Sequence, residues 1–312
     1  MTPVTSARRY PAAVAAIDDV IAAMPDWGGR EVRVEPIATG LTNANYRVVV
    51  DGTPYFVRVP GPSTELLAVD RGNEAFNTRA AAAAGAGPAL VASLDAPAAL
   101  VLAWLPGRTM SNAAFAEAGM PERIAEVLRR LHAGPRFRDA FDMFALTRYY
   151  LGVVDERAVP IPAGYRDRLD DVARIERALA ARPLPTVPCH NDLLAGNYLD
   201  DGERLWIVDY EYSGNNDPTF ELGNTAQELG LDDDRQEALA AAYFGAVDAG
   251  LLARMRLQMI MSDVGWTLWA AIQAKISPIN YDFWGWASER WERAEARLRG
   301  VELEGWLADA AG

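Results

Sequence analysis

The most constraining feature of the sequence is a segment with three oxygen-bearing side chains at fixed spacing. Asp192 ends a His-Asn-Asp triplet, Asn197 follows five residues later, and Asp209 follows twelve residues after that. The four residues before Asp209 (205–208, LWIV) form an apolar run that is typical of a short buried strand. The pattern therefore predicts a loop followed by a buried strand that delivers Asp209 to its end.

This combination of side chains is typical of phosphoryl transfer, which depends on positioning the reactants and on neutralising phosphate charge. Asp192 is predicted to orient an attacking hydroxyl group and to accept its proton. Asn197 and Asp209 are predicted to bind Mg²⁺, a hard cation that prefers oxygen ligands. An ordinary turn or helix cap is the alternative explanation of Asn-Asp before an apolar pair. The strand before Asp209 argues against that alternative.

Length and composition agree with a two-lobed chain, or with one large domain, that has a large core. The 312 residues exceed the size at which single cores usually stop growing, and 50% of them are hydrophobic. With 43 acidic and 30 basic residues the net charge is −13, which argues against a nucleic acid or an anionic membrane as partner. The single cysteine, Cys189, fits a reducing compartment. We expect a cytoplasmic protein without membrane insertion, and the sequence carries no signal for an oligomeric state.

The first hundred residues predict a small sheet with one long helix. Residues 32–37, 46–50 and 55–59 read as strands, and the pair 51–52 (Asp-Gly) marks a tight turn. The loop at 38–45 (ATGLTNAN) would suit backbone contacts to phosphates, although a plain hairpin turn explains it equally well. The residues of this loop that are predicted to bind a nucleotide are Thr39, Gly40, Thr42 and Asn43.

A strand cation and a helical carboxylate form the next pair. In kinases such a cation grips the α- and β-phosphates and is held by a helical Glu. Arg58 lies in the strand FVRV and Glu74 in a helical stretch, and a guanidinium can bridge phosphate and carboxylate. The alternative is that both residues are solvated surface charges. The pair precedes Asp192 along the chain, as in kinases, and this order favours a nucleotide site.

A further strand at 101–104 is broken by Leu-Pro-Gly at 105–107. This break is the predicted hinge between an N-terminal lobe (1–104) and a C-terminal lobe (105–312). Backbone groups of Ala103 and Leu105 are predicted to hold adenine there.

Aromatic residues dominate the last third of the chain. Trp266, Trp269 and Gln273 fall at i, i+3 and i+7, so they share one helical face. Core packing alone would explain such a stripe, but four more aromatic residues follow beyond Pro278: Tyr281, Phe283, Trp284 and Trp286. A quaternary ammonium has no N–H group and is recognised by aromatic faces, each worth about 0.5 to 2 kcal/mol. The density of aromatics therefore indicates an amine site.

Four passages together resemble a known family: GLTNANYRV, the arginine strand ending at residue 59, HNDLLAGN through IVDYEYSGNN and FELGN, and WTLWAAIQAKIS. The chain resembles the choline/ethanolamine kinases, a branch of the protein-kinase-like fold that also contains the aminoglycoside phosphotransferases. The resemblance implies an α+β, bilobal fold, with a small N-terminal antiparallel sheet lobe carrying one long helix and a larger, mainly helical C-terminal lobe. It also implies ATP and Mg²⁺ as cofactors.

The resemblance implies roles for individual residues. Asp192 would be the catalytic base, Asn197 and Asp209 the metal ligands, and Arg58 with Glu74 the nucleotide clamp. The residues at the positions of the family's amine site are Tyr212, Glu228, Trp266, Trp269, Tyr281 and Trp286, together with the hydroxyl-orienting Asp192. Some positions depart from the family: Trp286 stands where Tyr is usual, Tyr281 where Phe is usual, and Asp233 where an aromatic residue is common.

The implied activity is transfer of the γ-phosphate of ATP to the hydroxyl of choline. Ethanolamine kinase is the nearest alternative, since a primary ammonium needs hydrogen-bond acceptors as well as aromatic faces. An aminoglycoside-type phosphotransferase would need many carboxylates in a wide cleft. A catalytically silent binding module would have lost one of the three catalytic residues, and all three are present. His132 and Glu221 are expected to be structural.

Overall fold

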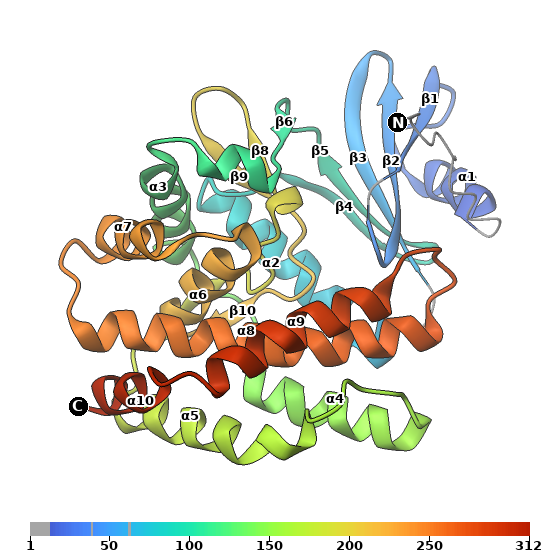
Figure 1. Cartoon of the computed structure of the whole chain (residues 1–312). Coiled ribbons are helices and arrows are strands. Elements are labelled where there is room, and N and C mark those ends of the chain that lie inside the picture. The colour runs from blue at the N-terminus through green and yellow to red at the C-terminus, as the bar shows by residue number, and fades with distance from the viewer. Residues whose placement is uncertain (1–12, 39, 62–63) are drawn as a thin grey trace, which may run out of the picture. The chain divides into compact units, whose positions relative to one another are not determined.

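The computed structural model describes residues 13–38, 40–61 and 64–312. They fold into two compact units (Figure 1): Met1–Glu65 with Pro88–Pro106, and Leu66–Gly87 with Gly107–Gly312. Residues 66–87, which the sequence analysis places in the first lobe, are thus part of the second unit. The side chains of Asn73 and Asn77 explain this placement, because each donates a 3.0 Å hydrogen bond to the carbonyl of Ser213.

The first unit is an antiparallel five-stranded sheet with one helix packed on it. The strand order is β1-β2-β3-β5-β4, and α1 (Ala13–Ala23) contributes Ile17 and Val20 to the same core as Val48, Val57 and Val101. The strands are β1 (Val32–Ile37), β2 (Asn43–Val50), β3 (Thr53–Pro60), β4 (Leu90–Asp95) and β5 (Ala98–Ala103). The predicted strands and the turn at 51–52 are confirmed, whereas β4 was not anticipated.

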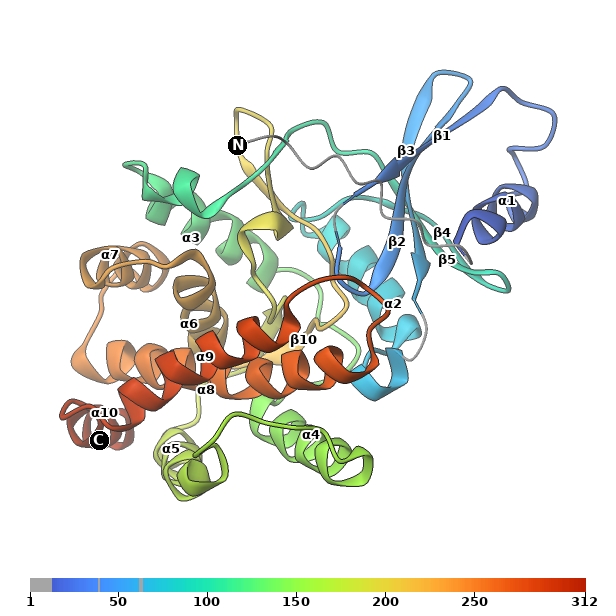
Figure 2. The same cartoon turned by 45° about the vertical axis from the view of Figure 1, so that its right-hand side comes forward.

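The second unit is built around α8 (Ala249–Ile276), which is 28 residues long. Nearly all residues from 253 to 273 of α8 are buried, with Arg256 partly exposed, because α4, α6, α9 and α10 pack around this helix. Both views show α9 lying along α8 (Figures 1 and 2). The other helices are α2 (Arg71–Ala83), α3 (Met120–His132), α4 (Met143–Arg157), α5 (Leu169–Ala181), α6 (Pro218–Leu229), α7 (Asp233–Phe244), α9 (Phe283–Leu298) and α10 (Leu303–Ala311).

Five short strands of the second unit frame the segment around Asp192. They are β6 (Arg108–Thr109), β7 (Val187–Cys189), β8 (Tyr198–Asp200), β9 (Leu205–Ile207) and β10 (Gly214–Asn216). Short 3₁₀ helices lie at Thr64–Leu67, Asn112–Ala116, Arg166–Arg168 and Ala195–Asn197. The strand predicted before Asp209 is β9, whose Leu205 and Ile207 are buried against α3. The predicted α+β fold class is confirmed by these two units.

Among the described residues, no single helix combines the length and the apolar character needed to cross a membrane. Only α7 and α8 taken together meet that test, and they are bent by 118° at their junction.

Candidate active site

Side chains of α6 bind the loop that carries Asp192 through hydrogen bonds to its backbone. The carboxylate of Glu221 accepts the backbone N–H groups of His190 (2.6 Å) and Asn191 (2.7 Å), one with each oxygen. Asn224, one turn further along α6, accepts the N–H of the residue after Asp192 at 2.7 Å. Asn191 has a φ of 70°, in the left-handed region that is unusual for residues other than glycine. These hydrogen bonds therefore hold the backbone before Asp192 in a conformation that it would rarely adopt without them.

His190 joins this loop to the strand segment before Asp209. Its Nδ1 accepts the N–H of Asp192 at 3.2 Å, so Nε2 carries the hydrogen and donates to the carbonyl of Val208 at 2.9 Å. The ring is completely buried, and burial lowers its pKa. The imidazole is therefore neutral at physiological pH and acts as a fixed bridge.

The two predicted metal ligands lie on adjoining backbone segments. The N–H of Val208, next to Asp209, donates to the carbonyl of Asn197 at 2.9 Å. The side-chain nitrogen of Asn197 donates to the carbonyl of Asp192 at 2.7 Å, which turns the amide oxygen the other way. Asp209 also has a left-handed φ of 77°. One carboxylate and one amide oxygen are ligands that fit Mg²⁺, which usually takes few protein ligands and keeps several waters.

Asp192 lies in a strongly perturbed electrostatic environment. Desolvation raises the pKa of its carboxyl group well above the ordinary value, and the negative charges of Glu228 and Asp209 raise it further. The positive charge of Arg290 opposes this increase. A perturbed carboxyl group among specific charge partners is a mark of functional sites. The same pattern shows that Glu228 and Arg290 act on Asp192 electrostatically.

Four of the predicted amine-site aromatic residues contact one another and form one aromatic group: Tyr212, Trp266, Trp269 and Trp286. Trp269 donates its indole N–H to the hydroxyl of Tyr212 at 2.7 Å. The ring of Tyr212 meets that of Trp266 edge to face, with centroids 4.8 Å apart, and Trp269 meets Trp286 in the same way at 5.5 Å. Trp266 and Trp269 are buried, and the indole nitrogen of Trp266 has no hydrogen-bond partner within the described chain. The structure thus brings together aromatics from the Asp209 segment, α8 and α9.

The remaining aromatics lie at the edge of this group. Tyr281 packs against Phe283 and Trp286, at centroid distances of 4.9 and 6.1 Å, and is 41% exposed. Trp284 points outward and is 43% exposed. Gln273, which the sequence places on the same face of α8, is buried.

Glu228 has a partner that sequence reasoning missed. Its Oε2 accepts a 2.7 Å hydrogen bond from the buried guanidinium of Arg290. Its Oε1 is buried and has no hydrogen-bond partner in the part of the chain described. Arg290 also stacks over Trp286, 4.1 Å from the ring centroid, and lies 3.8 Å from Asp263. Arg290 lies four residues after the predicted Trp286, one turn along a helix, and that spacing was the only available signal.

On the first unit, Gly40 has a φ of 114°, and a Cβ there would lie 2.8 Å from the side chain of Asn45. Asn43 donates its side-chain N–H to the hydroxyl of Thr42 at 3.0 Å. The predicted Thr39 lies outside the described residues. The backbone N–H of Ala103 donates to the carbonyl of Ala89 at 2.9 Å, so it is not available to adenine.

The predicted clamp residues belong to different units. Arg58 lies in β3 of the first unit and is 3% exposed. Glu74 lies in α2 of the second unit, where it pairs with Arg71 at 2.7 Å. Arg71 also pairs with Glu211 at 3.3 Å, which ties α2 to the segment after Asp209. The pairing of Arg58 with Glu74 stays a prediction, as does a backbone contact from Leu105.

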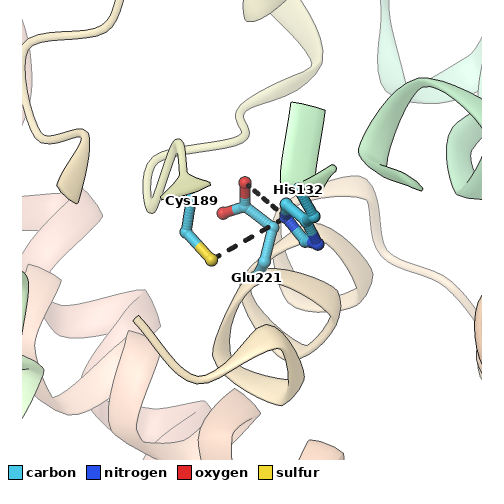
Figure 3. A group of neighbouring side chains, drawn as sticks. All are labelled: His132, Cys189 and Glu221. Carbon is cyan, nitrogen blue, oxygen red and sulfur yellow. Dashed lines mark hydrogen bonds and ion pairs between the residues drawn. The ribbon is translucent and has the colours of Figure 1, made fainter. Parts of the chain in front are cut away.

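A buried cluster lies beneath the loop and consists of His132, Cys189 and Glu221 (Figure 3). The Nε2 of His132 is 3.6 Å from the Glu221 carboxylate and 3.7 Å from the Cys189 sulfur. Its Nδ1 is 2.6 Å from the hydroxyl of Tyr243. Burial raises the pKa of Cys189 well above its ordinary value, so the thiol stays protonated. Glu221 already binds two backbone N–H groups, and these hydrogen bonds account for the cluster as a support for the loop.

Comparisons with known proteins identify the family of this chain. The sequence model of the phosphotransferase enzyme family (APH) matches residues 33–258. Protein LicA of Haemophilus influenzae is 28% identical over 249 residues, which cover 75% of this chain and 71% of LicA. Ethanolamine kinase 2 of Mus musculus is 28% identical over 299 residues, covering 86% of this chain and 77% of the mouse enzyme.

Solved structures extend the similarity to nearly the whole chain. The choline kinase LicA from Streptococcus pneumoniae has the same fold, with a TM-score of 0.78 at 24% identity, covering 92% of this chain and 99% of that one. A choline/ethanolamine kinase family protein from Mesorhizobium loti superposes with a TM-score of 0.83 at 36% identity, covering 96% of this chain and 99% of that one. The chain therefore belongs to the phosphotransferase enzyme family and, within it, to the choline/ethanolamine kinases.

Proposed function

We propose that this protein is a choline kinase, which transfers the γ-phosphate of ATP to the hydroxyl of choline and releases phosphocholine and ADP. The observation that carries the proposal is the aromatic group of Tyr212, Trp266 and Trp269, which Trp286 and Arg290 connect to a carboxylate, Glu228. Aromatic faces and one carboxylate suit a trimethylammonium group.

Asp192 is the proposed catalytic base. It would accept a hydrogen bond from the choline hydroxyl, orient its oxygen toward the phosphate and take its proton as the new P–O bond forms. The carboxylate of Glu221 holds the backbone N–H groups of the two residues before Asp192, and the neutral His190 accepts the N–H of Asp192 itself. Positioning of this kind is the main contribution that a protein makes to phosphoryl transfer.

Asn197 and Asp209 are the proposed ligands of Mg²⁺. When bound, the cation would neutralise charge on the phosphate oxygens. The left-handed backbone at Asp209 fits a carboxylate that is held for a function rather than for local stability.

The nucleotide is assigned chiefly to the first unit. The proposed contacts are the backbone of residues 40–43, the guanidinium of Arg58, the backbone of Ala103 other than its N–H and the backbone of Leu105, with Glu74 as a supporting carboxylate. A solved structure of LicA in complex with AMP, 22% identical to this chain, has the same fold.

An acceptor panel tests the proposal. ADP release would be measured with ATP and Mg²⁺ and with choline, ethanolamine, their two methylated intermediates or an aminoglycoside at equal concentrations. We expect the highest kcat/KM with choline. Rapid turnover of another acceptor without choline-dependent turnover would overturn the proposal.

Ethanolamine kinase is the second candidate. The buried Oε1 of Glu228 and the hydroxyl of Tyr212 are acceptors that a primary ammonium could use. Curated relatives that bear the name ethanolamine kinase match this chain over 86% of its length. A higher kcat/KM for ethanolamine than for choline would favour this candidate.

A further inference from the structure

We propose that Arg290 is a specificity-determining residue, which reserves the amine site for a cation with few or no N–H groups. It does so by taking one oxygen of Glu228 and one face of Trp286. This inference rests on the proposed function and adds a residue to it.

Arg290 limits the number of hydrogen-bond acceptors that Glu228 can offer to a substrate. A primary ammonium has three N–H donors, and leaving a buried donor unsatisfied costs about 1 to 3 kcal/mol, more for a charged group. Of the two oxygens of Glu228, Oε2 is held by Arg290 at 2.7 Å and only the buried Oε1 is left without a hydrogen-bond partner in the described chain. A trimethylammonium needs no acceptor and loses nothing by this arrangement.

Arg290 also covers one aromatic face of Trp286. The guanidinium of Arg290 lies 4.1 Å from the centroid of Trp286, so one face of that indole already binds a cation. Trp286 in turn packs edge to face against Trp269 and Tyr281. Arg290 therefore holds Trp286 as a wall of the aromatic group, while the faces of Trp266 and Trp269 carry the contact to the substrate.

The side chain of Arg290 is itself held firmly in place. Its side chain is 2% exposed, and its second terminal nitrogen lies 3.8 Å from the fully buried Asp263. Asp263 also binds Arg293 at 2.6 Å and Arg297 at 3.5 Å. Because a planar guanidinium bound on several sides cannot turn away, Glu228 keeps this partner when the substrate changes.

The test compares Arg290→Gln and Arg290→Lys with a matched control, Arg293→Gln, three residues away on the same helix. Arg293 binds Asp263 and Glu289 and, within the described residues, makes no hydrogen bond to Glu228 and no ring contact with Trp286. For each protein, kcat and KM would be measured with ethanolamine, its two methylated intermediates and choline. Thermal unfolding would confirm that every variant is folded.

We expect the choline to ethanolamine ratio of kcat/KM to fall about tenfold in Arg290→Gln, mainly through a lower KM for ethanolamine, because the second oxygen of Glu228 becomes an acceptor. Arg290→Lys should give a smaller fall, since a lysine keeps the charge but loses the fork and the stacking. If the Arg290→Gln variant does not fold, the Arg290→Lys variant alone tests the inference. The ratio in Arg293→Gln should stay within twofold of the wild type.

Two results would overturn the inference in different ways. An unchanged ratio in both folded Arg290 variants, with active wild-type protein, would remove the role of Arg290 and leave the proposed function intact. Wild-type protein that phosphorylates neither amine would overturn both.

Discussion

At the scale of single residues, the site depends on polar groups whose backbone or side-chain partners come from distant parts of the chain. Glu221 fixes the loop before Asp192, His190 fixes the segment before Asp209, and Arg290 fixes Glu228. Each of these groups is buried, so loss of one partner leaves the other unsatisfied. The reactive carboxyl group of Asp192 is therefore placed by its neighbours rather than by its own bonds.

Substitution Asp192→Asn tests the base directly. We expect turnover to fall roughly 10³-fold, because a positioned base contributes on the order of 10² to 10⁴, while choline binding changes little. ADP release and calorimetric titration with choline would measure the two quantities. The exposed Asp234 on α7 offers a control, since Asp234→Asn should leave both unchanged. Loss of choline binding in a folded Asp192→Asn variant would contradict the assigned role.

At the scale of elements, α6 is the common support of the site. All of its residues from Pro218 to Leu229 are buried, and one face carries Glu221, Asn224 and Glu228. The helix can approach α8 closely because position 223 is a glycine. A Cβ at Gly223 would lie 2.7 Å from the carbonyl oxygen of Met255. The position of the site residues on α6 therefore depends on a backbone contact and not only on their own side chains.

The substitution Gly223→Ala should separate α6 from α8. We expect it to lower the free energy of unfolding by about 1 to 3 kcal/mol, as overpacking of a core does, and to lower kcat/KM with choline. Urea unfolding would measure the first effect. The matched control is Gly152→Ala in α4, where no atom lies within 4 Å of the added Cβ. This control should be stabilised by up to about 1 kcal/mol, and equal destabilisation of both variants would refute the packing argument.

At the scale of the whole molecule, charge limits how a nucleotide can bind. The chain has a net charge of −13, so its overall field repels the phosphates of ATP. Attraction of ATP must then come from local cations such as Arg58 and from the metal proposed at Asn197 and Asp209. The aromatic group around Tyr212 needs neither of these to attract an amine.

Chelation separates the two proposed sites. With EDTA in excess of Mg²⁺ we expect ADP release to stop and to return when Mg²⁺ is restored. The rise in unfolding temperature on adding choline should persist, because a ligand present at 100 times its Kd stabilises the folded state by about 2.7 kcal/mol whatever the metal. A choline-induced shift that disappears with the metal would contradict the separation.

The sequence predicted most where the signal is local. The spacing of Asp192, Asn197 and Asp209 lies within twenty residues. The structure brings their segments together by one backbone hydrogen bond, from Val208 to Asn197, and by a side-chain bond from Asn197 to the carbonyl of Asp192. The strand before Asp209 was predicted because an apolar run of four residues is typical of a short strand, and Leu205 and Ile207 of this run are buried. The strand β4 was missed, since its residues alternate in exposure at the edge of the sheet and leave a weaker hydrophobic signal.

Partner choice was decided by the tertiary structure alone. Glu228 pairs with Arg290 and Glu221 with backbone N–H groups, and the sequence determines neither choice among 30 basic residues. The sequence by itself determined which groups are proposed as reactive, because chemistry is carried by residue type and local spacing. Only the fold decided which charges are neutralised, because a buried charge takes whichever partner the packing of distant helices brings within about 3 Å.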